Sequence, residues 1–457
     1  MFRTLLVLFS IGSAWSWTIA AEETTLRLAT FSADITIPLG HRCMGILDTK
    51  AQRIEDPLEA RGFVLLGPDA PIVFVALDWC EVRNGAYDLW RDTLAVVAKT
   101  SRERVLVCSL HQHDAPVIDT EAQSLLDSVG LVGELFDVPF HQACLKEVAS
   151  AVERAIPLAK PLTHIAIGQS EVEKIASNRR VVYADGVVRY DRLSRSSTDS
   201  PQATADEGEI DPNLKSIHFL SGDQTLVVLS SYATHPMSSY GQGSVSADFV
   251  GLARRRRQRE TPGAMQIYAT GCSGDVTAGK FNDGSAQARA TLIDRLYQAM
   301  VRASQALEPQ KIERIDFRFE TFHLPFHEGP QFKREAMTKV LHDHKASDRD
   351  RILAAMGLAS LNRIERGQGI DLPCLDLGVA QVVLLPGESF VGYQLMAQRV
   401  SLDSFVMAIG FGECWTGYIP TQRAFEERFG HDWRWVGPGC EAIIREKLTS
   451  VLRARSR

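Results

Sequence analysis

Two histidines separated by one residue stand where an apolar stretch of the chain ends. Residues 105–110 are apolar or small, and His111, Gln112 and His113 follow directly. The apolar run predicts a buried strand, and on a strand residues two apart point to the same side. Two neutral imidazoles placed in this way can bind a zinc ion, or one can bind it while the other transfers protons. For this motif alone, two hydrogen-bonded surface histidines are the alternative.

Two further apolar stretches lead to side chains that can bind a metal. Residues 225–230 lead to His235, and residues 380–385 lead to Glu388. A single histidine after a strand is usually structural, but beside the His-x-His motif it favours a shared site. Open α/β sheets keep their sites at the carboxyl ends of strands. We therefore expect these groups to lie together.

Other polar segments have more than one interpretation. Residues 271–279 are rich in glycine and follow a strand predicted over 266–270. They form either an ordinary turn or a loop whose N–H groups bind an oxyanion. Arg179, after a strand predicted around 164–167, is by itself a surface cation in a turn. The His342-Asp343-His344 stretch is polar and helix-like, so we expect it on the solvated surface.

Apolar runs of strand length alternate with helical patterns along the chain. Helices are predicted over 82–101 and 135–156, among others. Most strand patterns are continuously apolar, which indicates strands buried on both faces. The fold class is therefore α/β, with a mixed, largely buried sheet and flanking helices. The 457 residues, 45% of them apolar, suit one large domain or two tightly packed lobes.

The first residues have the layout of a secretory signal peptide. Arg3 precedes the apolar run 4–9, and Ala20-Ala21 precede two acidic residues. The apolar stretch is short and interrupted by serines, which argues against a membrane anchor. We expect cleavage after residue 21 and export of residues 22–457 to the periplasm or the outside of the cell.

Charge and cysteine usage exclude some classes of function. The net charge of −6 argues against broad nucleic-acid binding. The run of four arginines at 254–257 is expected on the solvated face of a helix that begins near Asp248. None of the eight cysteines forms a C-x-x-C pair, which argues against a cysteine zinc site.

Six short motifs together resemble, in order along the chain, those of the neutral, non-lysosomal ceramidase family. The resemblance covers roughly residues 28–440 and concerns the catalytic N-terminal domain of that family. It therefore implies that domain's fold. The motifs are His111-Gln112-His113, Asn178-Arg179, Ala233-Thr234-His235-Pro236, Gly274-Asp275-Val276, Pro386-Gly387-Glu388 and Gly417-Tyr418-Ile419-Pro420-Thr421.

The resemblance also implies roles for individual residues. The zinc ligands would be His111, His235, Glu388 and Tyr418. His113 would transfer protons, and Arg179 would bind or polarise the scissile carbonyl. A zinc ion with such ligands keeps a position for water and lowers the pKa of that water to roughly 7. The expected reaction is hydrolysis of a linear C–N amide bond, in which His113 protonates the leaving amine.

The chain departs from the family pattern in three ways. Thr277 stands at the position of the family's active-site serine. A second tyrosine expected after Tyr418 has no counterpart, and Phe425 and Phe429 lie in that region. We also expect no immunoglobulin-like C-terminal domain after the catalytic motifs. Because the only candidate base, His113, is needed for the leaving amine, we expect Thr277 to position substrate or water and not to act as a covalent nucleophile.

The sequence thus predicts an exported, single-domain, ceramidase-like zinc amidohydrolase. Its expected substrate is ceramide or another N-acyl lipid, which implies peripheral contact with membrane lipid. A zinc esterase using the same site is one alternative, and a binding protein that keeps zinc without turnover is another. His113 and Arg179 favour an enzyme, because a binding protein needs no unligated proton carrier.

Overall fold

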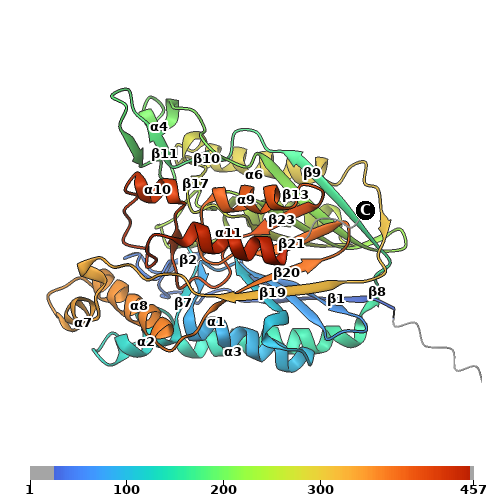
Figure 1. The fold of residues 1–457 in the computed structure, drawn as a ribbon, viewed down its shortest axis with the longest axis horizontal. Coiled ribbons are helices and arrows are strands. Elements are labelled where there is room, and N and C mark those ends of the chain that lie inside the picture. Colours follow the sequence, from blue (N-terminus) through green and yellow to red (C-terminus); the bar gives the residue numbers. More distant parts are fainter. Residues whose placement is uncertain (1–24, 453–457) are drawn as a thin grey trace, which may run out of the picture.

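Three β-sheets with helices packed against them form the framework of the chain (Figure 1). The computed structural model describes residues 25–452, so the predicted signal peptide lies outside the described residues. Within residues 25–452, no helix is long and apolar enough to cross a membrane.

The first sheet has the strand order β6-β4-β3-β1-β8. Helices α1 (Asn84–Ala98) and α3 (Val138–Ala155) pack against it. All its neighbouring strands are antiparallel except β4 and β6, which are parallel. Its strands are β1 (Arg27–Asp34), β3 (Glu59–Leu66), β4 (Ile72–Leu77), β6 (Val105–Ser109) and β8 (Lys160–Pro161).

The second sheet has the order β16-β14-β13-β9-β18. It is covered by α5 (Asp248–Glu260) and α6 (Ala286–Arg302), and its one parallel pair is β14–β16. Its strands are β9 (His164–Glu171), β13 (Asn213–Ser221), β14 (Gln224–Tyr232), β16 (Met265–Thr270) and β18 (Gln310–Lys311).

The third sheet has the order β19-β20-β21-β23. Helices α9 (Val391–Val400) and α11 (Cys440–Val451) cover it, and β21 and β23 are parallel. Its strands are β19 (Asp316–Phe322), β20 (Ile370–Asp376), β21 (Ala380–Leu384) and β23 (Phe405–Ile409).

Shorter elements complete the chain. Helices α2 (Thr120–Asp127), α7 (Arg334–His342) and α8 (Asp348–Glu365) gather at one end of the molecule (Figure 1). Helices α4 (Pro201–Thr204) and α10 (Gln422–Glu426) are short. The two-stranded pairs are β2 (Arg53–Ile54) with β15 (Ser244–Val245), β5 (Glu81–Val82) with β7 (Val117–Ile118), β10 (Ser177–Asn178) with β17 (Val276–Thr277), β11 (Arg180–Val182) with β12 (Val188–Tyr190), and β22 (Glu388–Ser389) with β24 (Tyr418–Ile419).

Side chains of all three sheets meet in one hydrophobic core. Phe63 of the first sheet lies 5.0 Å, between ring centroids, from Phe219 of the second. Met407 of the third sheet belongs to the same buried cluster. Strands buried between sheets and helices need apolar residues on both faces, which explains the continuous apolar runs. The predicted α/β class with mixed, buried strands and flanking helices is confirmed, and the strands divide among three sheets.

Each sheet has a parallel pair of strands at one edge, and hydrogen bonds connect the carboxyl ends of these three pairs. The N–H of Ser109, in β6, donates to the carbonyl of Phe411 at 3.1 Å. The N–H of Gly410 donates to the carbonyl of Thr270 at 2.9 Å. The hydroxyl of Thr270 donates to the carbonyl of Leu110 at 2.8 Å. The loops that follow the three parallel pairs are therefore held at one place.

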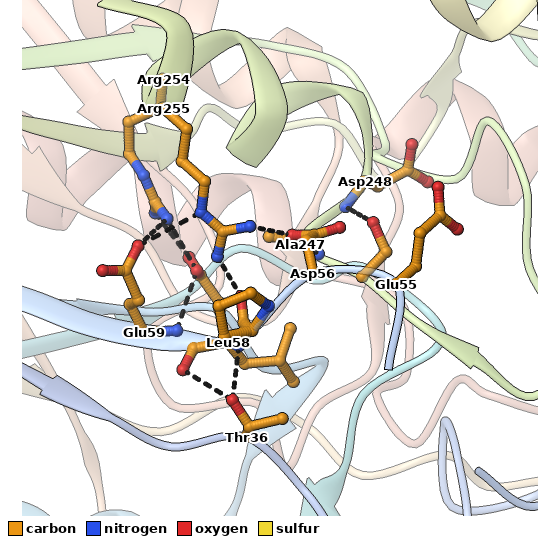
Figure 2. A network of polar contacts seen from close by, with 12 residues as sticks. Thr36, Glu55, Asp56, Leu58, Glu59, Ala247, Asp248, Arg254 and Arg255 are labelled. Carbon is orange, nitrogen blue, oxygen red and sulfur yellow. Dashed lines mark hydrogen bonds and ion pairs between the residues drawn. The ribbon is translucent and has the colours of Figure 1, made fainter. Parts of the chain in front are cut away.

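The arginine run in α5 is not the solvated patch that the sequence predicts. The helix begins at Asp248 as expected, but Arg254 is buried and donates to both carboxylate oxygens of Asp78, at 2.6 and 2.8 Å. Arg255 contacts the carboxylate of Asp56. Figure 2 shows both arginines reaching from α5 toward Glu59 and Asp56.

A buried arginine in this run has a physical reason. Arg254 lies on the face of α5 that is turned toward the ends of β3 and β4, where Asp78 and Glu59 accept its hydrogen bonds. A buried charge is tolerated when it is paired and hydrogen-bonded. The carboxylates lie far away in sequence, so helical spacing alone could not reveal the pairing. The network ties α5, which follows the His235 loop, to the first sheet.

The prediction for the His342-Asp343-His344 stretch agrees with the structure. His342 and His344 are exposed, as expected for a solvated stretch. All eight cysteines are buried and free, so the structure contains no disulfide among the described residues.

Candidate active site

The side chains of His111, His235 and Glu388 converge at the meeting point of the three parallel pairs. One carboxylate oxygen of Glu388, Oε2, lies 3.0 Å from Nε2 of His235 and 3.4 Å from Nε2 of His111. All three residues are buried, and one ligand atom from each lies within 4.8 Å of the other two. Two imidazole nitrogens and a carboxylate oxygen are a donor set that suits zinc.

Backbone carbonyls fix the tautomer of both histidines. Nδ1 of His235 lies 2.6 Å from the carbonyl of Ser273, and Nδ1 of His111 lies 3.1 Å from the carbonyl of Cys80. Because a carbonyl only accepts hydrogen bonds, each Nδ1 carries the proton. In the neutral rings, the lone pairs of both Nε2 atoms then face the Glu388 carboxylate. Either a proton on one ring or a metal cation between the three groups balances this arrangement, and metal-binding histidines are oriented in this way.

The charges around the cluster also call for a cation. Burial, with the added effect of Arg179, lowers the pKa of His235 to about 4, so this ring is neutral near pH 7. Burial also disfavours the charged form of His111, but the Glu388 carboxylate outweighs it and raises the pKa overall. Burial of Glu388 is likewise outweighed by His111 and His235, which hold its pKa well below the usual value. A bound metal would take the place of the proton on His111.

A second buried group, Cys80 with His111 and His113, also has its ligand atoms within 4.8 Å of one another. Sγ of Cys80 lies 3.8 Å from Nδ1 of His111, the nitrogen whose proton is directed at the Cys80 carbonyl. Burial raises the pKa of the Cys80 thiol well above its usual value, and metals bind the thiolate. The group with Glu388 is therefore the better metal site.

A left-handed backbone places His111. Strand β6 ends at Ser109, and His111 has φ of 65°. Phe411 has φ of 57°, and its ring stacks on that of His111 at 4.4 Å with an angle of 16°. Strained positive-φ residues cost about 1–3 kcal/mol and gather at functional sites. The rings of His111 and His113 are at 88° to each other, because they lie beyond the strand and not on its face as the alternation argument supposes.

Two glycines make room for Glu388 and Tyr418. Gly387 and Gly417, which precede them, have φ of 45° and 59°. A Cβ on Gly387 would lie 2.0 Å from the Thr416 hydroxyl, and one on Gly417 would lie 2.0 Å from a backbone oxygen. Glycine is therefore required at both positions. The two turns allow β22 and β24 to pair in parallel, with Glu388 opposite Tyr418.

Tyr418 links the metal-ligand cluster to Arg179. Its phenol forms a hydrogen bond with Glu388, and burial raises its pKa well above the usual value. Nη2 of Arg179 lies 3.4 Å from the phenol oxygen, while Nε donates to the carbonyl of Gly274 at 3.1 Å. Arg179 is buried, so it is not the surface cation of a turn.

His113 lies beside the cluster without being one of its three converging ligands. Its ring is 5.2 Å from that of His111 and 6.0 Å from that of His235. Both of its ring nitrogens are buried and have no hydrogen-bond partner among residues 25–452. Burial, with the neighbouring His111 and His235, lowers its pKa well below the usual value. The side chain of Tyr240 covers it, with the ring centroids 4.8 Å apart.

Thr277 is next to the site through its backbone. It forms a bridge with His235, and strand β17 pairs with β10 of the Asn178 segment. Its buried hydroxyl donates to the carbonyl of Leu193 at 3.1 Å. The structure therefore directs this hydroxyl toward residue 193.

The glycine-rich segment 271–279 supplies carbonyls to the site. The N–H groups of Gly271, Cys272 and Gly274 all donate within the protein, to the carbonyl of Tyr232, the side chain of Gln394 and the carbonyl of Ser389 respectively. They are therefore not available to an oxyanion. The carbonyl that orients His235 also comes from this segment, and both observations favour the alternative of a structural turn.

Sequence reasoning missed several residues around the site. Glu81 lies behind His111, with Oε1 3.8 Å from Nδ1, and accepts a hydrogen bond from the Trp433 indole at 3.0 Å. The ring of His431 lies 4.6 Å from that of Tyr418. Glu81, Tyr240 and His431 lie in short strands or loops without a periodic pattern. No local signal marks them, because only the fold brings them to the cluster.

Comparisons with known proteins indicate the fold of this chain. No protein-family model matches the chain, and no curated protein sequence matches it. Solved structures do match. A neutral ceramidase from Pseudomonas aeruginosa is 14% identical, with a TM-score of 0.66 over 95% of this chain and 76% of that one. The chain has the neutral ceramidase fold.

A second solved structure supports the same assignment of the fold. It is a ceramidase complexed with C2, 15% identical, with a TM-score of 0.65 over 94% of this chain and 75% of that one. The shared fold extends over most of the chain and therefore includes all three sheets. The expectation that the chain is built like a neutral ceramidase is confirmed for its fold.

Proposed function

We propose that this chain is a ceramidase-like, zinc-dependent amidohydrolase that cleaves the C–N amide bond of an N-acyl lipid. The observation that carries the proposal is the convergence of two oriented Nε2 lone pairs on the Glu388 carboxylate. The neutral ceramidase fold supports it, and ceramide is the first substrate to test. The signal-peptide pattern of residues 1–21 further supports export.

The residues present fit a zinc ion. His111, His235 and Glu388 would hold it, with Tyr418 as the fourth protein group within reach through its contact with Glu388. Nε2 of His111 is buried and makes no hydrogen bond of good geometry, although Glu388 Oε2 lies 3.4 Å away, so a metal cation between the two groups would satisfy both. Bound zinc supplies a Lewis acid that polarises a carbonyl and lowers the pKa of water.

The chain's own groups can carry the proton and the developing charge. Because its pKa is depressed and both nitrogens are unpartnered, His113 is neutral and can take a proton from the nucleophilic water. The same ring can then donate that proton to the leaving nitrogen. Arg179, held by Gly274 and Tyr418, can donate a hydrogen bond to the scissile carbonyl oxygen as its negative charge grows.

Metal analysis and a substrate panel test the proposal together. The purified protein should contain about one zinc per chain and hydrolyse ceramide or other N-acyl amides. His235→Ala should lose both properties. If the wild-type protein contains zinc but hydrolyses only esters, it is an esterase. Retention of zinc with no turnover of either class would indicate a binding protein.

A further inference from the structure

A cavity of about 490 Å³ lies between helices α7 and α8 and residues 430–435. One of its walls is apolar and comes largely from the two helices. This volume is within the range of small-molecule sites, which combine apolar walls with a few polar groups. The apolar lining side chains are Phe332, Met337, Val340, Leu353, Ala354 and Trp435.

His431 joins this cavity to the active site. It lines the cavity, and its ring lies 4.6 Å from the ring of Tyr418, whose phenol contacts Glu388 and Arg179. The cavity is therefore separated from Tyr418 by one side chain, that of His431. The side chain of His431 is exposed, so a ligand can reach it.

The backbone sets the hydrogen-bonding direction of His431. The N–H of Trp433 donates to Nδ1 of His431 at 3.0 Å. In the neutral ring the proton is then on Nε2, which has no hydrogen-bond partner among residues 25–452. Two other polar residues of the cavity are already paired: Arg434 donates to His327, and Asp432 forms an ion pair with Arg349. His431 thus presents a fixed, unused donor between the cavity and Tyr418.

We propose that this cavity receives one apolar arm of an amide substrate, and that Nε2–H of His431 donates a hydrogen bond to a polar group of the substrate beside that arm. The inference rests on the proposed amidohydrolase function and names the part of the chain that selects its substrate. Apolar walls bind a hydrocarbon arm by removing it from water. The hydrogen bond from Nε2–H of His431 would fix the position of the polar group from which the apolar arm extends.

Filling the cavity tests the apolar arm. Val340→Trp, on α7, should raise KM about tenfold for an amide with a long apolar arm and leave kcat and the KM of a short-armed amide unchanged. The control is Val96→Trp, the same change at an exposed position of α1. Two substrate series, one lengthened in the acyl group and the other in the amine, identify which arm enters. Equal KM values for Val340→Trp and Val96→Trp in both series would overturn the proposal.

Changing the donor tests the role of His431. His431→Ala should raise KM about three- to tenfold for the same long-armed substrate, which corresponds to the loss of one hydrogen bond. His431→Gln, which keeps an N–H donor, should recover most of the loss, and both variants should retain their metal. An unchanged KM in His431→Ala, or no recovery in His431→Gln, would contradict the assignment.

Direct binding separates this inference from the proposed reaction. A fluorescent long-chain N-acyl amide should bind wild-type protein and Val96→Trp with similar Kd, and Val340→Trp about tenfold more weakly. If wild-type protein binds the probe in this pattern but hydrolyses no amide, the proposed function fails and the cavity assignment stands. If amides are hydrolysed but Val340→Trp binds the probe normally, the cavity assignment fails alone.

Discussion

Glu388 and Tyr418 are register partners in the parallel strands β22 and β24, so a carboxylate and a phenol lie side by side at the active site. The phenol bonds Glu388 and contacts Arg179. Tyr418 therefore connects Glu388, which would donate an oxygen to a metal ion under the proposed function, with Arg179, which would meet the substrate carbonyl.

Removing only the hydroxyl of Tyr418 tests this link. Tyr418→Phe keeps the ring between His235 and His431 but loses both polar contacts. We expect weaker zinc binding, because one group of the site is lost, and a fall in kcat of about 10–100-fold. Zinc titration and steady-state kinetics measure the two effects. If both the zinc affinity and kcat are unchanged, the hydroxyl of Tyr418 has no role in the site.

Alanine variants should separate the two histidines of the His-x-His motif. His111→Ala should lose zinc and activity together, since Nε2 of His111 is one of the converging donors. His113→Ala should keep zinc and lose about 10²–10⁴ in kcat, the contribution expected of a proton-transfer group. Metal content and kcat are measured on the same preparations. Equal loss of zinc in both variants would show that His113 is a ligand.

Thr277 should not carry a covalent intermediate. Its hydroxyl donates to the Leu193 carbonyl, and a nucleophilic hydroxyl needs an adjacent base. Thr277→Ser should therefore remain active, and Thr277→Ala should lose activity only partly, with a loss of stability of about 1 kcal/mol from the missing hydrogen bond. Intact-mass analysis during turnover provides the check. An acyl adduct on Thr277 would refute this account.

Stability should fall as the pH drops below about 6.5, in part because of His141. Burial lowers the pKa of His141 to about 4, and the Trp90 indole donates to its Nε2 at 3.0 Å. Between pH 6.5 and 4 the unfolded chain binds a proton that the folded chain does not. The free energy of unfolding therefore decreases over this range, by up to about 3 kcal/mol from this group.

His141→Gln isolates that contribution, because glutamine can still accept from Trp90 without becoming charged. Urea unfolding of the variant at pH 8 and pH 5 should show a smaller difference than in the wild-type protein. The same difference in both proteins would mean that His141 titrates normally in the folded state.

The candidate ligand side chains can be identified from local sequence patterns alone. An apolar run followed by a residue that can bind a metal is a local pattern. It identifies His111, His235 and Glu388 without any knowledge of which strands pair. The same local pattern identified the strands and helices, because burial on both faces demands continuous apolar residues. The structure brings these three residues together as that pattern predicts.

The pairing of the strands and the surroundings of the site depend on contacts between residues far apart in the chain. An apolar run does not specify which strand it pairs with. The division into three sheets and the hydrogen bonds between their parallel edges therefore could not be derived from periodicity. From sequence, Arg254 is expected at the surface, but in the structure it is buried against Asp78. The glycine-rich segment could bind an oxyanion from its composition, but in the structure the N–H groups of Gly271 and Gly274 donate to carbonyls of the protein. Glu81, Tyr240 and His431 surround the site from unpatterned segments. Such contacts join residues far apart in sequence, and only the packed chain brings them within reach of one another.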